Sequence, residues 1–239
     1  METVLVVGAT GNIGVSAVKG ALNSHRKVLA IVRNQQSADK LLRHLGSLAS
    51  DQVTCIEADI LSDSGVRGVV DQVRAGELPP FQHVYSCVGG EYTTTPLKEI
   101  TTRQLRYNFS TSFEANFFAY RDTIDYLLEQ GHPASTWTIC TGAQGDIAAY
   151  PVPAMPQGAL FSMATAACRE NANTNVRFNE VYLAFRVEVD EDAAQHGVTS
   201  ASEFASVYEQ LLGRPDIRSS RVRVDSIGDL KELKFEKKF

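Results

Sequence analysis

Short apolar runs alternate with amphipathic segments from one end of the chain to the other. Runs of this kind, rich in β-branched residues, are typical of strands that are buried on both faces of a parallel sheet. The strands predicted in this way are residues 3–7, 28–32, 53–58, 83–88, 136–140, 176–183 and 222–227. The segments between them carry apolar residues at helical spacing. The helices predicted from this spacing are residues 14–22, 38–48, 64–75, 109–130, 158–171 and 204–212.

Helix-end signals support this division. Gly131 directly follows the long helix 109–130, and Pro133 lies beyond it as a stop signal. Ser200 and Glu203 form a capping-box pattern ahead of the helix 204–212. Strands that alternate with helices predict a single doubly wound, Rossmann-type α/β domain over residues 1–239. It would have a parallel sheet of about seven strands, with helices on both faces.

A glycine-rich turn follows the first predicted strand and opens the first predicted helix. Gly8 permits a tight turn, Gly11 lets the backbone approach a pyrophosphate, and Gly14 allows close packing of helix on strand. The helix N-terminus then offers free N–H groups to phosphate oxygens. The residues expected to bind a dinucleotide here are Gly8, Thr10, Gly11, Asn12, Ile13 and Gly14.

The end of the second strand predicts which dinucleotide binds. Sites for NAD place an acidic residue there to bind the ribose 2′-hydroxyl, but this strand ends in Arg33 and Asn34. A guanidinium at that position suits a 2′-phosphate. We therefore expect NADP(H) as cofactor, bound with help from Arg33 and Asn34.

Charge and composition narrow the classes of partner. The net charge is −5 and the basic residues are scattered, which argues against nucleic acid as a partner. The basic tail, from Lys231 to Lys238, alternates with acidic residues and is interpreted as a solvated end. No signal peptide or membrane-length apolar stretch is visible, so a cytoplasmic protein without a membrane partner is expected. The four cysteines are widely spaced, which predicts neither a metal site nor a disulfide framework.

In these features the chain resembles the short-chain dehydrogenase/reductase family over nearly its whole length. The glycine motif is followed by Asp59 and Ile60, which look like the family's adenine-contacting pair. Residues 87–90 stand where the family has Asn-Asn-Ala-Gly, Asn116 matches its active-site asparagine, and residues 176–179 resemble its Ile-Arg-Val-Asn segment. The resemblance implies that the cofactor also contacts Asp59, Ile60, Val88, Gly89 and Gly90.

The departures from the family lie where its chemistry is performed. The family pairs a tyrosine with a lysine four residues later, yet no lysine occurs between Lys98 and Lys231. Ungapped matching puts Pro153 at the tyrosine position and Gln157 at the lysine position. Matching on Tyr150 puts Ala154 at the lysine position instead, and matching on Phe161 puts Thr165 there. The family's serine falls at Thr141 or Gly142.

The residues expected in the loops around the cleft include Glu91, Tyr92, Thr141, Gln144, Asp146, Tyr150 and Arg186, and most of the candidate catalytic residues come from this set. Asp146 is a candidate proton donor or base, and Tyr150 a shifted substitute for the family tyrosine. Thr141 can hold a carbonyl by a hydrogen bond, while Asn116 is a candidate only by its position. Each also has an ordinary structural interpretation, as a loop aspartate, a packed aromatic residue or a buried polar residue.

The stretch 150–156 carries prolines at 151, 153 and 156. It is predicted to be an extended, stiff segment rather than the start of a regular helix. Such a segment would either form a reshaped wall of the cleft or serve as a plain connection.

Three functions remain open from the sequence. The first is a non-redox isomerase, cyclase or cycloaddition-type enzyme of small-molecule, secondary metabolism that retains NADP(H). The second is an NADPH-dependent reductase of a carbonyl or iminium substrate, with Tyr150 or Asp146 as acid. The third is a non-catalytic module that senses NADP. The family resemblance also implies a homodimer or homotetramer, and the small residues of 158–171 permit close helix packing.

Overall fold

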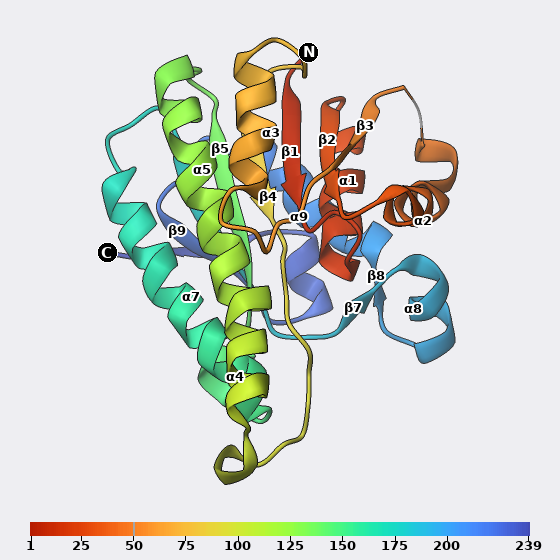
Figure 1. The fold of residues 1–239 in the computed structure, drawn as a ribbon, viewed down its shortest axis with the longest axis vertical. Coiled ribbons are helices and arrows are strands. Elements are labelled where there is room, and N and C mark those ends of the chain that lie inside the picture. The colour runs from red at the N-terminus through yellow and green to blue at the C-terminus, as the bar shows by residue number, and fades with distance from the viewer. Residues whose placement is uncertain (50) are drawn as a thin grey trace.

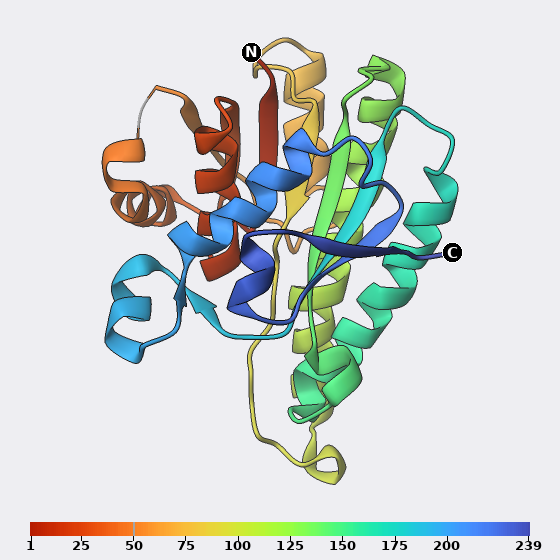
Figure 2. The same cartoon turned by 180° about the vertical axis from the view of Figure 1, so that it is seen from behind.

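The computed structural model describes residues 1–49 and 51–239. Its centre is an eight-stranded sheet with the order β10-β9-β6-β5-β4-β1-β2-β3 (Figures 1 and 2). The strands are β1 (Thr3–Val7), β2 (Lys27–Val32), β3 (Val53–Glu57), β4 (His83–Ser86), β5 (Thr136–Gly142), β6 (Arg177–Leu183), β9 (Ser220–Val224) and β10 (Lys234–Lys237). All neighbouring strands run parallel except β10, which pairs antiparallel with β9.

Helices cover both faces of this sheet. They are α1 (Asn12–Asn23), α2 (Gln35–Leu45), α3 (Gly65–Arg74), α4 (Thr102–Asn108), α5 (Ala115–Gln130), α6 (Gln144–Ile147), α7 (Pro151–Glu170), α8 (Asp190–His196) and α9 (Ala201–Gly213). Figure 1 shows α3, α5 and α7 on one face, and Figure 2 shows α9 crossing the other. A π-helical turn, Phe109–Glu114, joins α4 to α5, and two short strands, β7 (Val187–Glu188) and β8 (Thr199–Ser200), flank α8. None of the described helices is both long and apolar enough to cross a membrane.

The doubly wound fold predicted from the sequence is confirmed. β1 pairs with β2 on one side and β4 on the other, so the strand order reverses between β1 and β4. Ligands of such sheets bind in the crevice at this reversal, beyond the carboxyl ends of the strands. All seven predicted strands have counterparts, and the eighth, β10, was missed.

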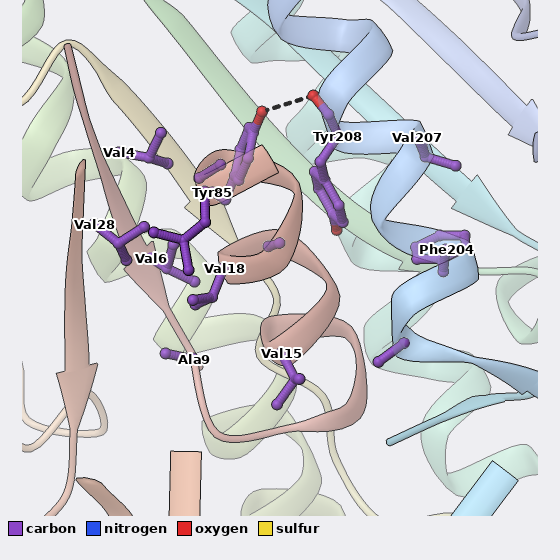
Figure 3. Close-up of a cluster of buried hydrophobic side chains, with 14 of the residues drawn as sticks. Val4, Val6, Ala9, Val15, Val18, Val28, Tyr85, Phe204, Val207 and Tyr208 are labelled. Carbon is purple, nitrogen blue, oxygen red and sulfur yellow. Dashed lines mark hydrogen bonds between the residues drawn. The ribbon is translucent and has the colours of Figure 1, made fainter. Parts of the chain in front are cut away.

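Each face of the sheet has its own apolar core. Under α1 and α9, valines of β1 and β2 pack against Phe204 and Tyr208 (Figure 3). There the Tyr85 hydroxyl donates to the carbonyl of Tyr208 at 3.1 Å. On the other face the rings of Trp137 and Phe178 stack at 5.1 Å beneath α5 and α7. The sheet whose strand ends border the crevice is therefore held by an apolar core on each face.

The prediction for residues 150–156 was wrong, because helix α7 begins at Pro151. Pro151 and Pro153 lie in the first turn of α7, where backbone N–H groups have no partner within a helix and a proline costs no hydrogen bond. Pro156 lies further inside and removes one hydrogen bond. Val152, Pro153 and Pro156 are buried, and this packing keeps the segment helical.

The solvated-end interpretation of the basic tail was wrong only for its last lysine, because all four residues of β10, Lys234–Lys237, are exposed. The tail forms β10, and the Lys238 side chain, 7% exposed, forms an ion pair with the fully buried Glu180 of β6. Lys238 also donates to the carbonyl of Phe161 in α7 at 3.2 Å. The buried carboxylate attracts the last lysine inward, a contact that the local alternation of charges did not reveal.

Acidification is expected to weaken the fold through His83. Its ring is fully buried, with Nδ1 2.9 Å from the Thr136 hydroxyl and Nε2 3.1 Å from the Glu2 carboxylate. Burial lowers the pKa of His83 from its usual value of 6.5 to about 4. Between these two values the unfolded chain binds a proton that the folded chain does not. The contribution of His83 to the free energy of unfolding is therefore complete above pH 6.5 and decreases as the pH drops towards 4.

The slope expected from His83 is about 1 kcal/mol per pH unit within that window. Urea unfolding of the wild type and of His83→Gln at several pH values measures it, and the variant should show a flatter dependence. Equal slopes in the two proteins would remove His83 from the explanation.

Candidate functional site

The glycine turn is built as tightly as its spacing suggested. Gly8 has a φ of +83°, which favours glycine, and a Cβ there would lie 3.1 Å from the backbone of Cys87. A Cβ on Gly14 would lie 2.0 Å from the carbonyl oxygen of Gly8. Gly11 is different, since a Cβ there would come no nearer than 3.6 Å to any other atom. Gly8 and Gly14 are therefore required by the protein itself, whereas a Cβ at Gly11 would make only an ordinary contact with the carbonyl oxygen of Gly8.

The N-terminus of α1 is open for a phosphate. Gly11 caps this helix, and among the residues that the structure describes no side chain accepts a hydrogen bond from its first turn. The Asn12 side chain points elsewhere, because its Oδ1 accepts a hydrogen bond from the backbone N–H of Val189 at 3.2 Å. Thr10 and Ile13 are partly exposed beside it. An open helix N-terminus next to a glycine that leaves room fits a pyrophosphate.

Arg33 and Asn34 lie side by side at the carboxyl end of β2. Arg33 is exposed, and none of the ion pairs within the described residues includes it. Asn34 has a structural task, since its Oδ1 accepts from the N–H of Ser37 and caps α2. Asp59 likewise accepts from the N–H of Leu61, and Ile60 is partly buried after β3. Arg33 is thus an unengaged cation at the place where a 2′-phosphate is expected.

Asn116 lies behind the loop that follows β4. Its Oδ1 accepts from Ser86, and its Nδ2 donates to the carbonyls of Val88 and Ser112. The residue is fully buried, and these bonds use both amide hydrogens. Asn116 therefore fixes the loop containing Val88, and its amide has no hydrogen left for a proton relay.

Gly89 is exposed in that loop, whereas Gly90 lies against the start of the π-helical turn. A Cβ on Gly90 would lie 2.3 Å from the Ser112 hydroxyl and 2.5 Å from Asn108 Oδ1. Only glycine allows this close contact. The loop after β4, which lies at the expected nicotinamide end of the cleft, is therefore held close to the π-helical turn before α5.

A hydrogen bond joins α7 to the end of β5, at the edge of the sheet where the cleft of a doubly wound fold is expected. The backbone N–H of Gly142 donates to Gln157 Oε1 at 2.7 Å. Gln157 is only 7% exposed, and α7 contains neither a tyrosine nor a lysine. We refer to this pair of residues as the Gly142–Gln157 clasp.

Two tyrosines form a wall beside the clasp. A Cβ on Gly142 would lie 3.4 Å from the Tyr92 hydroxyl oxygen. The ring of Tyr92 meets that of Tyr150 edge to face, with centroids 5.7 Å apart. Tyr92 is 59% exposed overall, but desolvation of its hydroxyl raises the pKa of this phenol above its usual value, and it is protonated at neutral pH. The structure therefore brings Tyr150 to the cleft, together with Tyr92, Gly142 and Gln157.

Thr141 and Asp146 lie in a different cluster, between β6, β9 and α6. The Thr141 hydroxyl donates to Glu180 at 2.7 Å, and Glu180 is also paired with Arg221 at 2.9 Å. Asp146 lies 4.0 Å from Arg221 and forms a hydrogen bond with Tyr182. The Thr141 hydroxyl is thus engaged away from the Gly142–Gln157 clasp, whereas the Asp146 side chain is 53% exposed, and the catalytic roles suggested for both stay predictions.

Between β6 and α9, the elements β7, α8 and β8 form a small separate unit. Glu188 of β7 accepts hydrogen bonds from Arg186 and from His196, the latter at 2.6 Å. The unit is tied to α1 by Lys19, which donates to Asp190 at 2.5 Å. Together with the Asn12–Val189 contact, this attaches the unit directly to the glycine turn.

Sequence reasoning missed two residues of the cleft. Gln157 appeared only as the residue at the position of the family's lysine, and its signal was a neutral amide where the family has a charged side chain. Tyr92 was one of several polar residues expected in the loops around the cleft. Only the fold shows that both lie next to Gly142, because the three residues come from three separate segments.

A doubly wound sheet with an open glycine turn defines the dinucleotide-binding class of protein. The model of the short chain dehydrogenase family matches residues 2–192. The chain is 54% identical over 242 residues to the short-chain dehydrogenase/reductase iacG of Pestalotiopsis fici, covering 99% of this chain and 96% of that protein. The chain therefore belongs to the short-chain dehydrogenase/reductase family.

Solved structures share this fold at low sequence identity. A short-chain dehydrogenase/reductase from Mycobacterium ulcerans superposes with a TM-score of 0.81 at 16% identity, over 98% of this chain and 92% of that one. ElxO, solved with NADP bound, gives a TM-score of 0.78 at 12% identity, over 90% of this chain and 93% of its own. At such identities the likeness concerns the fold alone.

Arg33 provides a direct test of cofactor choice. Arg33→Ala is expected to weaken NADPH binding roughly 10- to 100-fold, because hydrogen bonds between charged groups contribute about 1.5–3 kcal/mol. NADH lacks the 2′-phosphate, and its affinity should stay the same. Calorimetric titration measures both dissociation constants, with Arg43→Ala on the exposed side of α2 as the matched control. An equal loss for the two cofactors would contradict the assignment.

Proposed function

We propose that this protein is an NADP(H)-binding enzyme of small-molecule, secondary metabolism that works without the tyrosine–lysine pair of its family. Its chemistry would be isomerisation, cyclisation or cycloaddition in the cleft beyond the carboxyl ends of the strands. The glycine turn, the open N-terminus of α1 and the unengaged Arg33 support the cofactor. NADP-bound relatives of the fold such as ElxO are consistent with it.

The observation that carries this proposal is the Gly142–Gln157 clasp. Ungapped matching puts the family's serine at or next to Gly142 and its lysine at Gln157, so a neutral amide bonded to a backbone N–H takes the place of a hydroxyl and an ammonium group. An amide neither gives nor takes a proton at neutral pH. A bound NADPH would supply a hydride, but the clasp offers no proton to accompany it.

A second function is favoured by the tyrosine wall. The Tyr92 hydroxyl lies beside Gly142 and is protonated at neutral pH, so it can donate a hydrogen bond, although its raised pKa makes it a weak acid for proton transfer. Tyr150 lies against it and can take part in the same role. With these phenols as the acid, the protein would be an NADPH-dependent reductase of a carbonyl or iminium substrate.

The two functions differ in whether NADPH is consumed in the reaction. Candidate cyclic and aromatic carbonyl substrates are incubated with the protein and either NADPH or NADP⁺, with products followed by mass spectrometry and NADPH by its absorbance. Equal conversion with both cofactor forms and constant absorbance would support the non-redox enzyme. Conversion only with NADPH, with stoichiometric loss of absorbance, would support the reductase. Tight cofactor binding without any conversion would favour a sensing module.

We also propose that the protein acts in the cytoplasm as a homodimer or homotetramer, joined through α5 and α7. A groove of about 580 Å³ lies between these helices, lined largely by aromatic and small residues. Phe117 is 39% exposed beside it, and Ala159 and Ala166 allow a second copy to approach closely. Sedimentation of the purified protein tests this, and a monomer at micromolar concentration would contradict it.

A further inference from the structure

The amide of Gln157 has one end fixed and the other end free. A backbone N–H can only donate, so the atom that meets Gly142 N at 2.7 Å must be the amide oxygen. This bond fixes the orientation of the side chain and turns its NH₂ group away from Gly142. The side chain is 7% exposed, so little freedom remains for it to turn back.

The NH₂ group has no acceptor within the protein. Among residues 1–49 and 51–239, the only hydrogen bond of the Gln157 side chain is the one to Gly142. Nε2 is also not one of the fully buried polar atoms of the described residues that lack a hydrogen-bond partner. A largely buried amide with an unused donor costs about 1–3 kcal/mol unless a ligand or water satisfies it. The donor is therefore available to whatever enters the cleft.

Gly142 and the Tyr92 hydroxyl lie beside this amide, on the side of its oxygen. A Cβ at 142 would lie at ordinary contact distance, 3.4 Å from the Tyr92 hydroxyl oxygen and 3.7 Å from Gln157 Oε1, so glycine leaves a gap that a methyl group would fill. The Tyr92 and Tyr150 rings border this gap edge to face. The three heavy atoms nearest a Cβ at 142 belong to Tyr92 and Gln157. This gap is therefore bordered by a phenol and an amide, which are both uncharged.

We infer that Gln157 Nε2 donates a hydrogen bond to the carbonyl oxygen of a neutral, planar, conjugated or aromatic substrate lying against Tyr92 and Tyr150. A carboxylate or phosphate would require a cation, which the clasp does not provide. An amide donor holds and polarises a carbonyl without protonating it. This inference rests on the cleft of the proposed function and names the class of its substrate.

Two probes of nearly equal shape isolate the carbonyl. Acetophenone and ethylbenzene are titrated by ligand-observed NMR against the full chain saturated with NADP⁺. Acetophenone should bind about fivefold more tightly, as one hydrogen bond of about 1 kcal/mol gives. Gln157→Leu and Gln157→Glu should both remove this preference, since neither keeps the NH₂ group. Gln130→Leu, at the exposed end of α5, should retain it.

A further variant tests the position of the gap. Gly142→Val fills it and should weaken both probes together, while the affinity for NADP⁺ in the Gln157 variants should stay near that of the wild type. A preference that is absent in the wild type, or unchanged in Gln157→Leu, would overturn the inference, as would unaltered binding of both probes to Gly142→Val. If NADP⁺ itself does not bind, the proposed cofactor role fails. The same comparison on the chain without added cofactor then decides the carbonyl inference alone.

Discussion

Gly14→Ala is expected to abolish measurable NADPH binding and to lower the free energy of unfolding by about 3 kcal/mol or more. The added methyl carbon would lie 2.0 Å from the carbonyl oxygen of Gly8 and 2.8 Å from the backbone of Ala9. Neither is the end of a flexible side chain, so α1 must move away from β1. That movement disturbs both the core under α1 and the turn that faces the phosphates.

Gly11→Ala separates binding from folding. Gly11 has a φ of −81°, which any residue adopts, and a Cβ would meet nothing nearer than 3.6 Å. The fold should therefore keep its melting temperature, while the methyl group occupies the space through which a pyrophosphate approaches. We expect NADPH binding to weaken roughly 10-fold or more, which corresponds to about 1.4 kcal/mol. Calorimetry and thermal unfolding of both variants check this. Unchanged NADPH affinity in Gly11→Ala would mean that the phosphates do not lie on this turn.

Arg177→Met is expected to cost about 3 kcal/mol of folding free energy, without a direct effect on the cleft. The Arg177 side chain is buried, and its Nη1 donates to the carbonyls of Leu211, Arg214 and Ile217. Nη2 donates to the carbonyl of Leu212 at 3.4 Å. Three of these four carbonyls belong to the end of α9 or the residue after it, so the guanidinium satisfies a helix C-terminus inside the protein.

Methionine fills similar volume but leaves these carbonyls without a donor, and each unsatisfied buried group costs about 1–3 kcal/mol. The loss of the buried positive charge offsets part of this cost. Arg214→Met is the matched control, because Arg214 is half exposed and its pair with Asp216 is worth at most about 1 kcal/mol. Urea unfolding of the two variants gives the comparison. Equal losses would show that the buried carbonyls find other partners.

The strands and the glycine turn could be predicted because their signals are local. Val4 to Val7 form an unbroken apolar run that ends at a glycine, and the spacing of Gly8, Gly11 and Gly14 has a direct steric cause. The capping box at Ser200 and the left-handed Gly131 after α5 were likewise predictable, since each depends on residues within a single turn.

The cleft could be predicted only in part, because its contacts join distant segments. Gly142 and Gln157 meet by hydrogen bond across fifteen positions of sequence, and Lys238 reaches Glu180 across fifty-eight. The start of α7 was predicted wrongly because local preferences of proline were given more weight than position, although the first turn of a helix tolerates it. Thr141 was proposed from its place in the chain, and its direction, towards Glu180, follows from the alternation of side chains along β5 and β6.

The assignment of this chain as an NADP(H)-binding protein is tested most directly by calorimetric titration of the purified protein with NADPH and then NADH. Micromolar binding of NADPH, at least about tenfold tighter than that of NADH, is the expected result, because only NADPH offers a 2′-phosphate to Arg33. Binding of neither cofactor, or equal binding of both, would contradict it.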